Sequence, residues 1–196
     1  LWYRGPDGSV AGFRFRDSLR KDAEQVVARL ESDSYAVSLL SGDREQAVED
    51  AARQSRIKAW RGGVNPADKI AALKRLGESH KVLMVGDGLN DAPALAQAHV
   101  SMSPATAADI TQRAADLVFQ GDRLAPVAEA ISVAKRARAM AFQNFGVALV
   151  YNAVFVPLAM AGYVTPLVAA IAMSTSSILV TANAMRLSIP NLRVRT

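Results

Sequence analysis

The chain has 196 residues, a net charge of +5 and no cysteine, which excludes disulfides and thiolate metal sites within it. Residues 139–185 contain no Asp, Glu, Lys, Arg or His, whereas charges of both signs are frequent before them. Much of the basic excess flanks this uncharged stretch, as is typical of membrane segments, and it disfavours nucleic-acid binding as the explanation of the charge. The N-terminus lacks a signal-peptide pattern, so we expect the chain to begin within a longer protein.

The first part of the chain alternates predicted strands and helices. Residues 1–4 and 8–15 are expected to form a hairpin around a Pro-Asp-Gly turn, and apolar residues at helical spacing after Asp17, a candidate N-cap, predict a helix to about Glu31. Strands are then predicted at 35–40, 57–60, 82–85, 100–102 and 117–119, and helices at 45–54, 67–76, 92–97 and 106–114. This alternation predicts an α/β fold with a parallel sheet wrapped by helices, in which ligands bind at the carboxyl ends of the strands.

A long helix is predicted from Leu124, and it becomes apolar after residue 138. Residues 139–163 and 167–185 are each long enough to cross about 30 Å of hydrocarbon. A buried hairpin in a soluble domain is the alternative, but two adjacent uncharged spans flanked by Lys and Arg favour the membrane. We therefore divide the chain into a domain at 1–123, a connecting helix at 124–138, spans at 139–163 and 164–187, and a tail at 188–196.

Three short polar segments follow predicted strands. Ser41–Asp43 offers a hydroxyl, a glycine amide and a helix N-terminus to phosphate oxygens, although this tripeptide alone is also an ordinary turn. Pro66–Lys69 places an ammonium one turn into a helix, from where it can reach a phosphoryl group. Gly86–Asp91 follows the most apolar strand, and its carboxylates at Asp87 and Asp91 are hard ligands suited to Mg²⁺ beside phosphate.

These segments resemble motifs of the P-type ATPases, whose phosphorylation domain has the haloacid dehalogenase-like fold. Gly86–Asp91 is similar to their G-D-G-x-N-D motif, Ser41–Asp43 to T-G-D, Pro66–Lys69 to P-x-x-K, and Asp17–Arg20 to D-x-x-R. The resemblance implies a partial, Rossmann-like phosphorylation domain followed by a two-helix transmembrane hairpin. It also implies an ion-translocating ATP hydrolase that forms an aspartyl phosphate, with the D-K-T-G-T nucleophile segment and the nucleotide-binding and actuator domains outside this sequence.

The resemblance also assigns roles to residues. Asp87 would ligate Mg²⁺ with support from Asp91, Lys69 and Ser41 would contact the phosphoryl group, and ATP would be bound mainly by domains outside this chain. The implied catalytic residues are Ser41, Gly42, Asp43, Lys69, Asp87, Asn90 and Asp91, and the implied cofactor-binding glycines are Gly86 and Gly88.

The uncharged spans resemble those of copper(I) pumps in the heavy-metal class. Residues 151–152 match a Y-N pattern, residues 173–177 an M-x-x-S-S pattern, and residues 183–187 an N-A-L-R-L ending. A thioether suits Cu(I), and the side chains of Met173 and Ser177 share one face of a helix. The predicted ligands of the transported soft ion, with Cu(I) favoured, are Tyr151, Asn152, Met173 and Ser177, whereas Ser174, Thr175 and Asn183 are expected to join helices.

The resemblance further implies a multi-pass protein of the plasma or inner membrane, in contact with the lipid bilayer and with the remaining domains of the pump. Its phosphorylation domain and C-terminus would be cytoplasmic. Residues 102–109 replace a glycine-rich M-G-x-G-T-D segment and, with Ser41, resemble the subset associated with cytochrome oxidase assembly and nitrogen fixation. Two alternatives stay open: a catalytically inactive, truncated membrane fragment, and a membrane-anchored phosphatase of the same fold.

Overall fold

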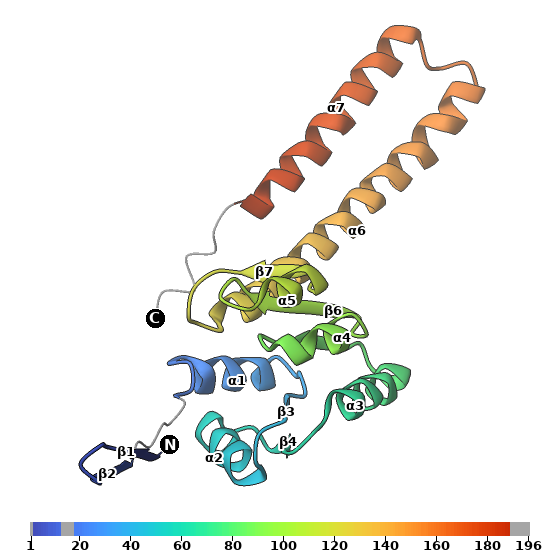
Figure 1. The fold of residues 1–196 in the computed structure, drawn as a ribbon. Coiled ribbons are helices and arrows are strands. Elements are labelled where there is room, and N and C mark those ends of the chain that lie inside the picture. The colour runs from blue at the N-terminus through green and yellow to red at the C-terminus, as the bar shows by residue number, and fades with distance from the viewer. Residues whose placement is uncertain (1, 13–17, 189–196) are drawn as a thin grey trace. The chain divides into compact units, whose positions relative to one another are not determined.

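A computed structural model describes residues 2–12 and 18–188 of the chain. It contains two compact units, Leu1–Ala128 and Glu129–Thr196. Figure 1 shows the order of their elements along the chain. The two units have different architectures and are taken in turn.

The first unit begins with the predicted hairpin. Strands β1 (Trp2–Arg4) and β2 (Val10–Gly12) pair antiparallel, with Trp2 opposite Gly12. The turn between them contains Gly8 at a φ of +80°, a conformation that glycine adopts without strain. The Pro-Asp-Gly signal therefore predicted the hairpin correctly, and residues 13–15 of the predicted second strand lie outside the described residues.

The next helix begins later than its sequence predicts. Helix α1 runs Ala23–Ser32, and Asp22, not Asp17, occupies its N-cap position. Asp17 itself lies outside the described residues. The buried face of α1 consists of Ala23, Val26 and Val27, which belong to the apolar stripe that the helical spacing predicts. Leu19, also part of that predicted stripe, precedes the helix and is exposed.

Two parallel sheets follow α1. Strand β3 (Ser38–Leu40) leads through α2 (Glu45–Ser55) to its parallel partner β4 (Ala59–Arg61). After α3 (Pro66–Ser79), strands β5 (Leu83–Val85), β6 (Val100–Pro104) and β7 (Leu117–Phe119) form a parallel sheet in that order. The connections are η1 (Leu89–Asp91), α4 (Ala92–Leu95) and α5 (Asp109–Ala114).

The predicted single sheet is therefore divided in the described part of the chain. No described strand pairs with both β3 and β5, so each is an edge strand of its own sheet. The core nevertheless forms around the strands and their helices: Val48 of α2 and Leu95 of α4 are 2% and 1% exposed, and Ser103 of β6 is fully buried. Parallel strands alternating with helices are the α/β architecture that the sequence predicts.

The second unit is a helical hairpin. Helix α6 (Ala125–Met160) begins in the first unit and continues through the second, and α7 (Pro166–Met185) is followed by a 3₁₀ turn, η2 (Arg186–Ser188). Thr165 caps α7 by accepting a hydrogen bond from the Val168 N–H, and Pro166 occupies its first turn. Both helices are long and apolar enough to cross a membrane, and their most apolar windows are not buried within the structure. A core helix of a soluble protein would be mostly buried.

Candidate functional site

The N-terminus of α3 positions the lysine of the predicted site. The Asn65 side chain accepts a hydrogen bond from the Asp68 N–H at 2.8 Å, and Pro66 begins the helix. This cap fixes the first turn, from which Lys69 projects. Asn65 was not among the predicted site residues, although an Asn directly before a helix-starting proline is a recognisable cap signal.

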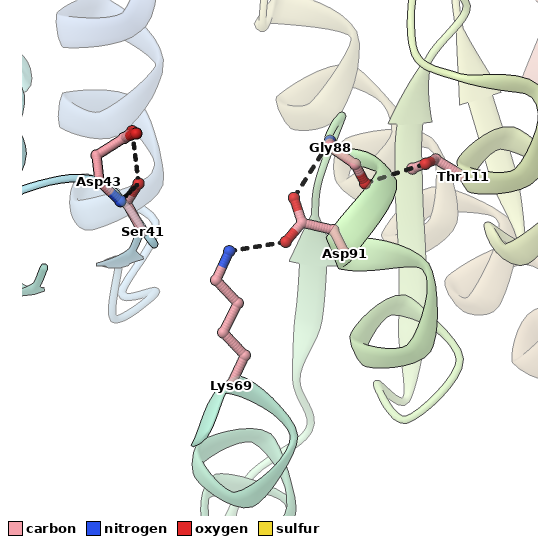
Figure 2. A network of polar contacts seen from close by, with 6 residues as sticks. All are labelled: Ser41, Asp43, Lys69, Gly88, Asp91 and Thr111. Atoms are coloured by element: carbon pink, nitrogen blue, oxygen red, sulfur yellow. Dashed lines mark hydrogen bonds and ion pairs between the residues drawn. The ribbon is translucent and has the colours of Figure 1, made fainter. Parts of the chain in front are cut away.

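Lys69 reaches the loop that follows β5. Its Nζ lies 2.7 Å from Oδ1 of Asp91, and the two side chains are only 12% and 15% exposed. The second carboxylate oxygen of Asp91 accepts a hydrogen bond from the Gly88 N–H at 3.2 Å. Figure 2 shows that the Asp91 carboxylate thereby joins α3 to the loop. A largely buried ion pair of this kind depends strongly on both partners.

Two glycines of the loop allow this approach. A Cβ added to Gly86 would lie 3.1 Å from Cβ and 3.2 Å from Oδ2 of Asp91, and one added to Gly88 would lie 3.1 Å from the same Oδ2. Any side chain at either position would press on the carboxylate that binds Lys69. The glycines predicted to bind a cofactor therefore have a local packing role in this structure.

Thr111 supports the loop from the opposite side and was not among the predicted site residues. Its side chain, from α5, is fully buried and donates a hydrogen bond to the Gly88 carbonyl at 3.0 Å. A buried hydroxyl needs such a partner. Nothing in the spacing of residues 106–114 distinguishes Thr111 from other helical residues, so only the fold reveals this contact.

Asp87 has a different environment from Asp91. Its side chain is 69% exposed, and its Oδ2 lies 3.9 Å from an Arg20 guanidinium nitrogen. Asn90 is also exposed. Within the described ranges, His, Cys, Asp and Glu form no cluster of three that could hold a metal ion. Shared ligation of Mg²⁺ by Asp87 and Asp91 thus stays a prediction; Asp87 has an accessible hard-oxygen donor, whereas both oxygens of Asp91 already have partners.

The segment Ser41–Asp43 forms a separate set of contacts at the end of β3. The Ser41 hydroxyl donates to Oδ2 of Asp43 at 2.8 Å and accepts from the Asp43 N–H at 3.2 Å. The Ser41 carbonyl also accepts a hydrogen bond from the Val64 N–H, just before α3. Gly42 and Asp43 are exposed. No hydrogen bond or ion pair found among residues 2–12 and 18–188 joins Ser41 or Asp43 to Lys69 or Asp91.

The predicted ion ligands occupy more than one face of the hairpin. Tyr151 stacks on Phe155 at 4.7 Å between ring centroids and lines an apolar groove of about 410 Å³ between α6 and α7. Met173 is 64% exposed and Ser177 is exposed. Asn152 is also exposed and donates to the Ala148 carbonyl of its own helix. Tyr151 thus lines the groove, whereas the other three side chains are exposed, and their joint binding of an ion stays a prediction.

The predicted helix-joining residues behave in two ways. Asn183 of α7 donates hydrogen bonds to the side chains of Asn144 at 2.9 Å and Gln143 at 3.3 Å on α6, so it does link the helices. The hydroxyls of Ser174 and Thr175 instead donate to carbonyls of α7 itself. Both patterns satisfy polar groups in an apolar setting.

Comparison with known proteins identifies the class to which this fold and site belong. Parallel strands with a lysine and carboxylates at their carboxyl ends characterise the first unit, and a family model for haloacid dehalogenase-like hydrolases matches residues 7–99. The sequence is 54% identical over 191 residues to "Nitrogen fixation protein FixI" of Bradyrhizobium diazoefficiens, covering 92% of this chain and 26% of that protein. It is 37% identical over 185 residues to "Probable copper-exporting P-type ATPase V" of Mycobacterium tuberculosis H37Rv, covering 93% and 24%.

A solved structure gives the same result. The crystal structure of a zinc-transporting PIB-type ATPase in the E2.Pi state matches with a TM-score of 0.83 at 30% identity, over 88% of this chain and 28% of that chain. Over most of its length the chain matches the C-terminal region of the heavy-metal P-type ATPases. It spans about a quarter of the length of the curated relatives above. The resemblance drawn from the motifs, including that to the nitrogen-fixation subset, is confirmed.

Proposed function

We propose that the protein containing this chain is an ATP-driven exporter of a soft metal ion, most consistent with Cu(I), which works through an aspartyl phosphate. The observation that carries the proposal is the contact between Lys69 and Asp91. It brings a lysine from α3 and a carboxylate from the loop after β5 to one place, where the two motifs of the family predict a phosphate site. Sites at the carboxyl ends of parallel strands are typical of α/β folds.

Each residue has a chemical task in this proposal. Lys69, held by Asp91, offers a cation for the charge of a transferring phosphoryl group. The Ser41 hydroxyl and the exposed Gly42 segment offer hydrogen-bond donors from the end of β3. Asp87, exposed and hard in character, would hold Mg²⁺. When bound, Mg²⁺ neutralises phosphate charge in the transition state.

The nucleophilic aspartate is proposed to come from a segment outside this sequence. Strands β3 and β5 carry the Ser41 and Asp87 segments, and each has an edge that no described strand pairs. Unpaired strand edges are readily satisfied by a further strand. A strand between them would bring its carboxyl end next to both segments, which is the position that an attacking carboxylate needs.

The identity of the ion is argued from side-chain chemistry. Met173 presents an exposed thioether, a soft ligand suited to Cu(I) more than to Zn²⁺ or Mn²⁺. Relatives at similar identity are named for different metals: "Copper-exporting P-type ATPase" of Bacillus subtilis at 36%, and "Manganese-exporting P-type ATPase" of Mycobacterium bovis at 34%. Sequence similarity alone therefore does not identify the transported metal. Because Asn152, Met173 and Ser177 are exposed on the hairpin, we propose that other helices of the pump complete the site.

The membrane position follows from the basic residues beside the hairpin. Arg138 lies with its guanidinium 5.5 Å from the Phe142 ring centroid where the uncharged stretch of α6 begins, and Arg186 follows the last residue of α7. Basic residues flanking a two-pass hairpin favour a cytoplasmic location for both of its ends. We accordingly propose an inner or plasma membrane protein whose ATP-handling domains are cytoplasmic.

The proposal is tested with the full-length protein in lipid vesicles. ATP with Mg²⁺ should drive accumulation of Cu(I) over Zn²⁺ and Mn²⁺, and Met173→Ala should abolish this selectivity. Met160→Ala serves as the matched control, because Met160 is an 84% exposed methionine at the end of α6. Equal transport of Cu(I) by Met173→Ala and by the parent protein would contradict the ion assignment.

The two alternatives give different results in the same system. A membrane-anchored phosphatase would release phosphate from small phosphate esters and would move no metal. The inert-fragment hypothesis concerns the 196-residue chain alone, which should form no acid-stable phosphoprotein from labelled ATP. Such a signal from the short chain would show that its own residues supply the nucleophile.

A further inference from the structure

The start of α6 is held by a carboxylate from a distant part of the chain. Asp22 accepts hydrogen bonds from the Leu124 N–H, at 3.0 Å to Oδ1 and 2.9 Å to Oδ2, and from the Ala125 N–H at 2.8 Å to Oδ2. These distances are normal for N–H···O bonds, and the charge of the acceptor strengthens them. A negative charge also interacts favourably with the N-terminus of a helix.

The orientation of Asp22 is unusual for its position. Asp22 is the N-cap residue of α1, where an aspartate ordinarily accepts a hydrogen bond from its own helix. Its side chain makes no such bond with α1. The carboxylate instead serves a helix that begins about a hundred residues later in the sequence.

The first turn of α6 depends on this single side chain. Leu124, which precedes the helix, has no side-chain acceptor and cannot cap it. Pro126 has no N–H, and the Val127 N–H bonds to the Leu124 carbonyl at 2.9 Å. The two remaining donors are therefore the ones that bond to Asp22. Because Val127 is only 4% exposed, this turn lies partly in the core, where unsatisfied N–H groups are costly.

Arg20, two residues before Asp22, contacts the loop that follows β5 and carries Asp87, called the Asp87 loop below. One of its guanidinium nitrogens lies 3.9 Å from Oδ2 of Asp87, and another donates to the Gly121 carbonyl at 3.4 Å. Its guanidinium also lies 5.9 Å from the centroid of the Phe119 ring, at the end of β7. These contacts are long and individually weak. Together they connect the Asp87 loop to the segment immediately before α6.

We propose that Arg20 and Asp22 transmit the state of the Asp87 loop to the start of α6, with Asp22 as a positioning residue. Binding of phosphate and a cation at Asp87 changes the charge that Arg20 faces, and Asp22 moves with Arg20 because only Lys21 separates them. Helix α6 is continuous from its first turn into the first candidate membrane span, so a shift of that turn acts on the span. The inference rests on the proposed function, because it requires a loop whose occupancy changes during a reaction cycle.

The test compares three variants of the full-length protein: Asp22→Ala, Asp22→Asn and Asp33→Asn. Asp33 is the matched control, because it is an exposed aspartate at the other end of the same helix. Removing a cap should raise the population with an opened first turn about fivefold to thirtyfold in Asp22→Ala. Asp22→Asn keeps one acceptor oxygen and should give an intermediate effect.

Two measurements distinguish transmission from simple helix stability. The first is the number of metal ions transported per ATP hydrolysed. The second is amide hydrogen exchange in a peptide covering residues 121–127, with and without beryllium fluoride as a phosphate analogue. We expect the analogue to change exchange there in the parent protein and in Asp33→Asn. In Asp22→Ala this response should be lost, and the transport ratio should fall while phosphoenzyme still forms.

Several results would overturn the inference. A parental transport ratio in Asp22→Ala would do so, as would an unchanged response to beryllium fluoride. If Asp22→Ala does not accumulate as folded protein, Asp22→Asn decides by the same two measurements. A parent protein that forms no phosphoenzyme would contradict the proposed function instead. A parent protein that pumps normally beside an unaffected Asp22→Asn would contradict only the inference about Asp22.

Discussion

Replacing Asp91 by asparagine tests the interpretation of the Lys69–Asp91 pair most sharply. The substitution preserves the shape of the side chain and removes its charge. Lys69, which is 12% exposed, would then hold an ammonium group without a counterion in a largely dry position. The unpaired cation, more than the lost hydrogen bond, should determine the stability of the variant.

The size of the effect follows from the burial of the two side chains. Breaking a buried ion pair by removing one partner costs about 3–5 kcal/mol. Because the side chains retain 12% and 15% of their exposure, water offsets part of this cost, and we expect a loss of about 2–3 kcal/mol. The double variant Lys69→Met with Asp91→Asn should lose less than the sum of the single variants, with a coupling free energy of about 1–3 kcal/mol.

Denaturant unfolding of the chain in detergent measures these changes. Trp60, on β4, reports on the first unit by fluorescence once the exposed Trp2 is replaced by phenylalanine. A lower unfolding midpoint with an unchanged slope reports a loss of stability. The control is Asp50→Asn, which breaks an exposed pair with Arg53 and should change stability by less than about 1 kcal/mol.

The double-mutant cycle determines whether Lys69 and Asp91 interact energetically. If the two single effects add to the double effect within about 0.5 kcal/mol, the residues do not interact energetically, and the pair cannot be the element that organises the loop.

Three further predictions concern other contacts. The Ser101 side chain and N–H hold the pKa of Asp116 below its ordinary value. Because the pKa is lower in the folded state, the Asp116 carboxylate contributes stability above the unfolded pKa, and this contribution is lost as pH falls through the folded pKa. Asp116→Asn should therefore flatten the acid limb of a stability–pH curve. Gly88→Ala, with a Cβ 3.1 Å from Oδ2 of Asp91, should lower the thermal midpoint by an amount equivalent to about 1–3 kcal/mol. Asn183→Leu should remove the hydrogen bonds between α6 and α7 and cost about 0.6 kcal/mol in steric-trap unfolding of the hairpin, and no change would show that those bonds are energetically neutral.

The strands and helices could be predicted because their patterns are local. The apolar run at residues 82–85 became β5, and residues 167–185 fall within α7. The start of α1 was wrong by several residues because Asp17 and Asp22 offer the same capping signal. Which aspartate stands at the helix start depends on contacts with α6, and no local pattern contains them.

The sequence predicted which polar segments follow the strands, but not which side chains within them contact one another. Spacing placed Lys69, Asp87 and Asp91 at the ends of strands or helices, because such ends meet at one edge of a sheet. It did not determine which aspartate binds Lys69, since both lie within five residues of Gly86 and Gly88. Thr111 was missed because its role depends only on its burial against Gly88. The predicted ion ligands lie on α6 and α7, and their convergence with other helices of the pump stays a proposal.

ATP hydrolysis by the full-length protein as a function of Mg²⁺ concentration tests the central claim most directly. That claim is that the Asp87 loop holds the ion that assists phosphoryl transfer. Asp87→Asn should lower the rate at saturating ATP by about a hundredfold or more and shift the Mg²⁺ requirement upward, whereas Asp33→Asn should leave both unchanged. Hydrolysis by Asp87→Asn at the parental rate and with the parental Mg²⁺ dependence would contradict the account.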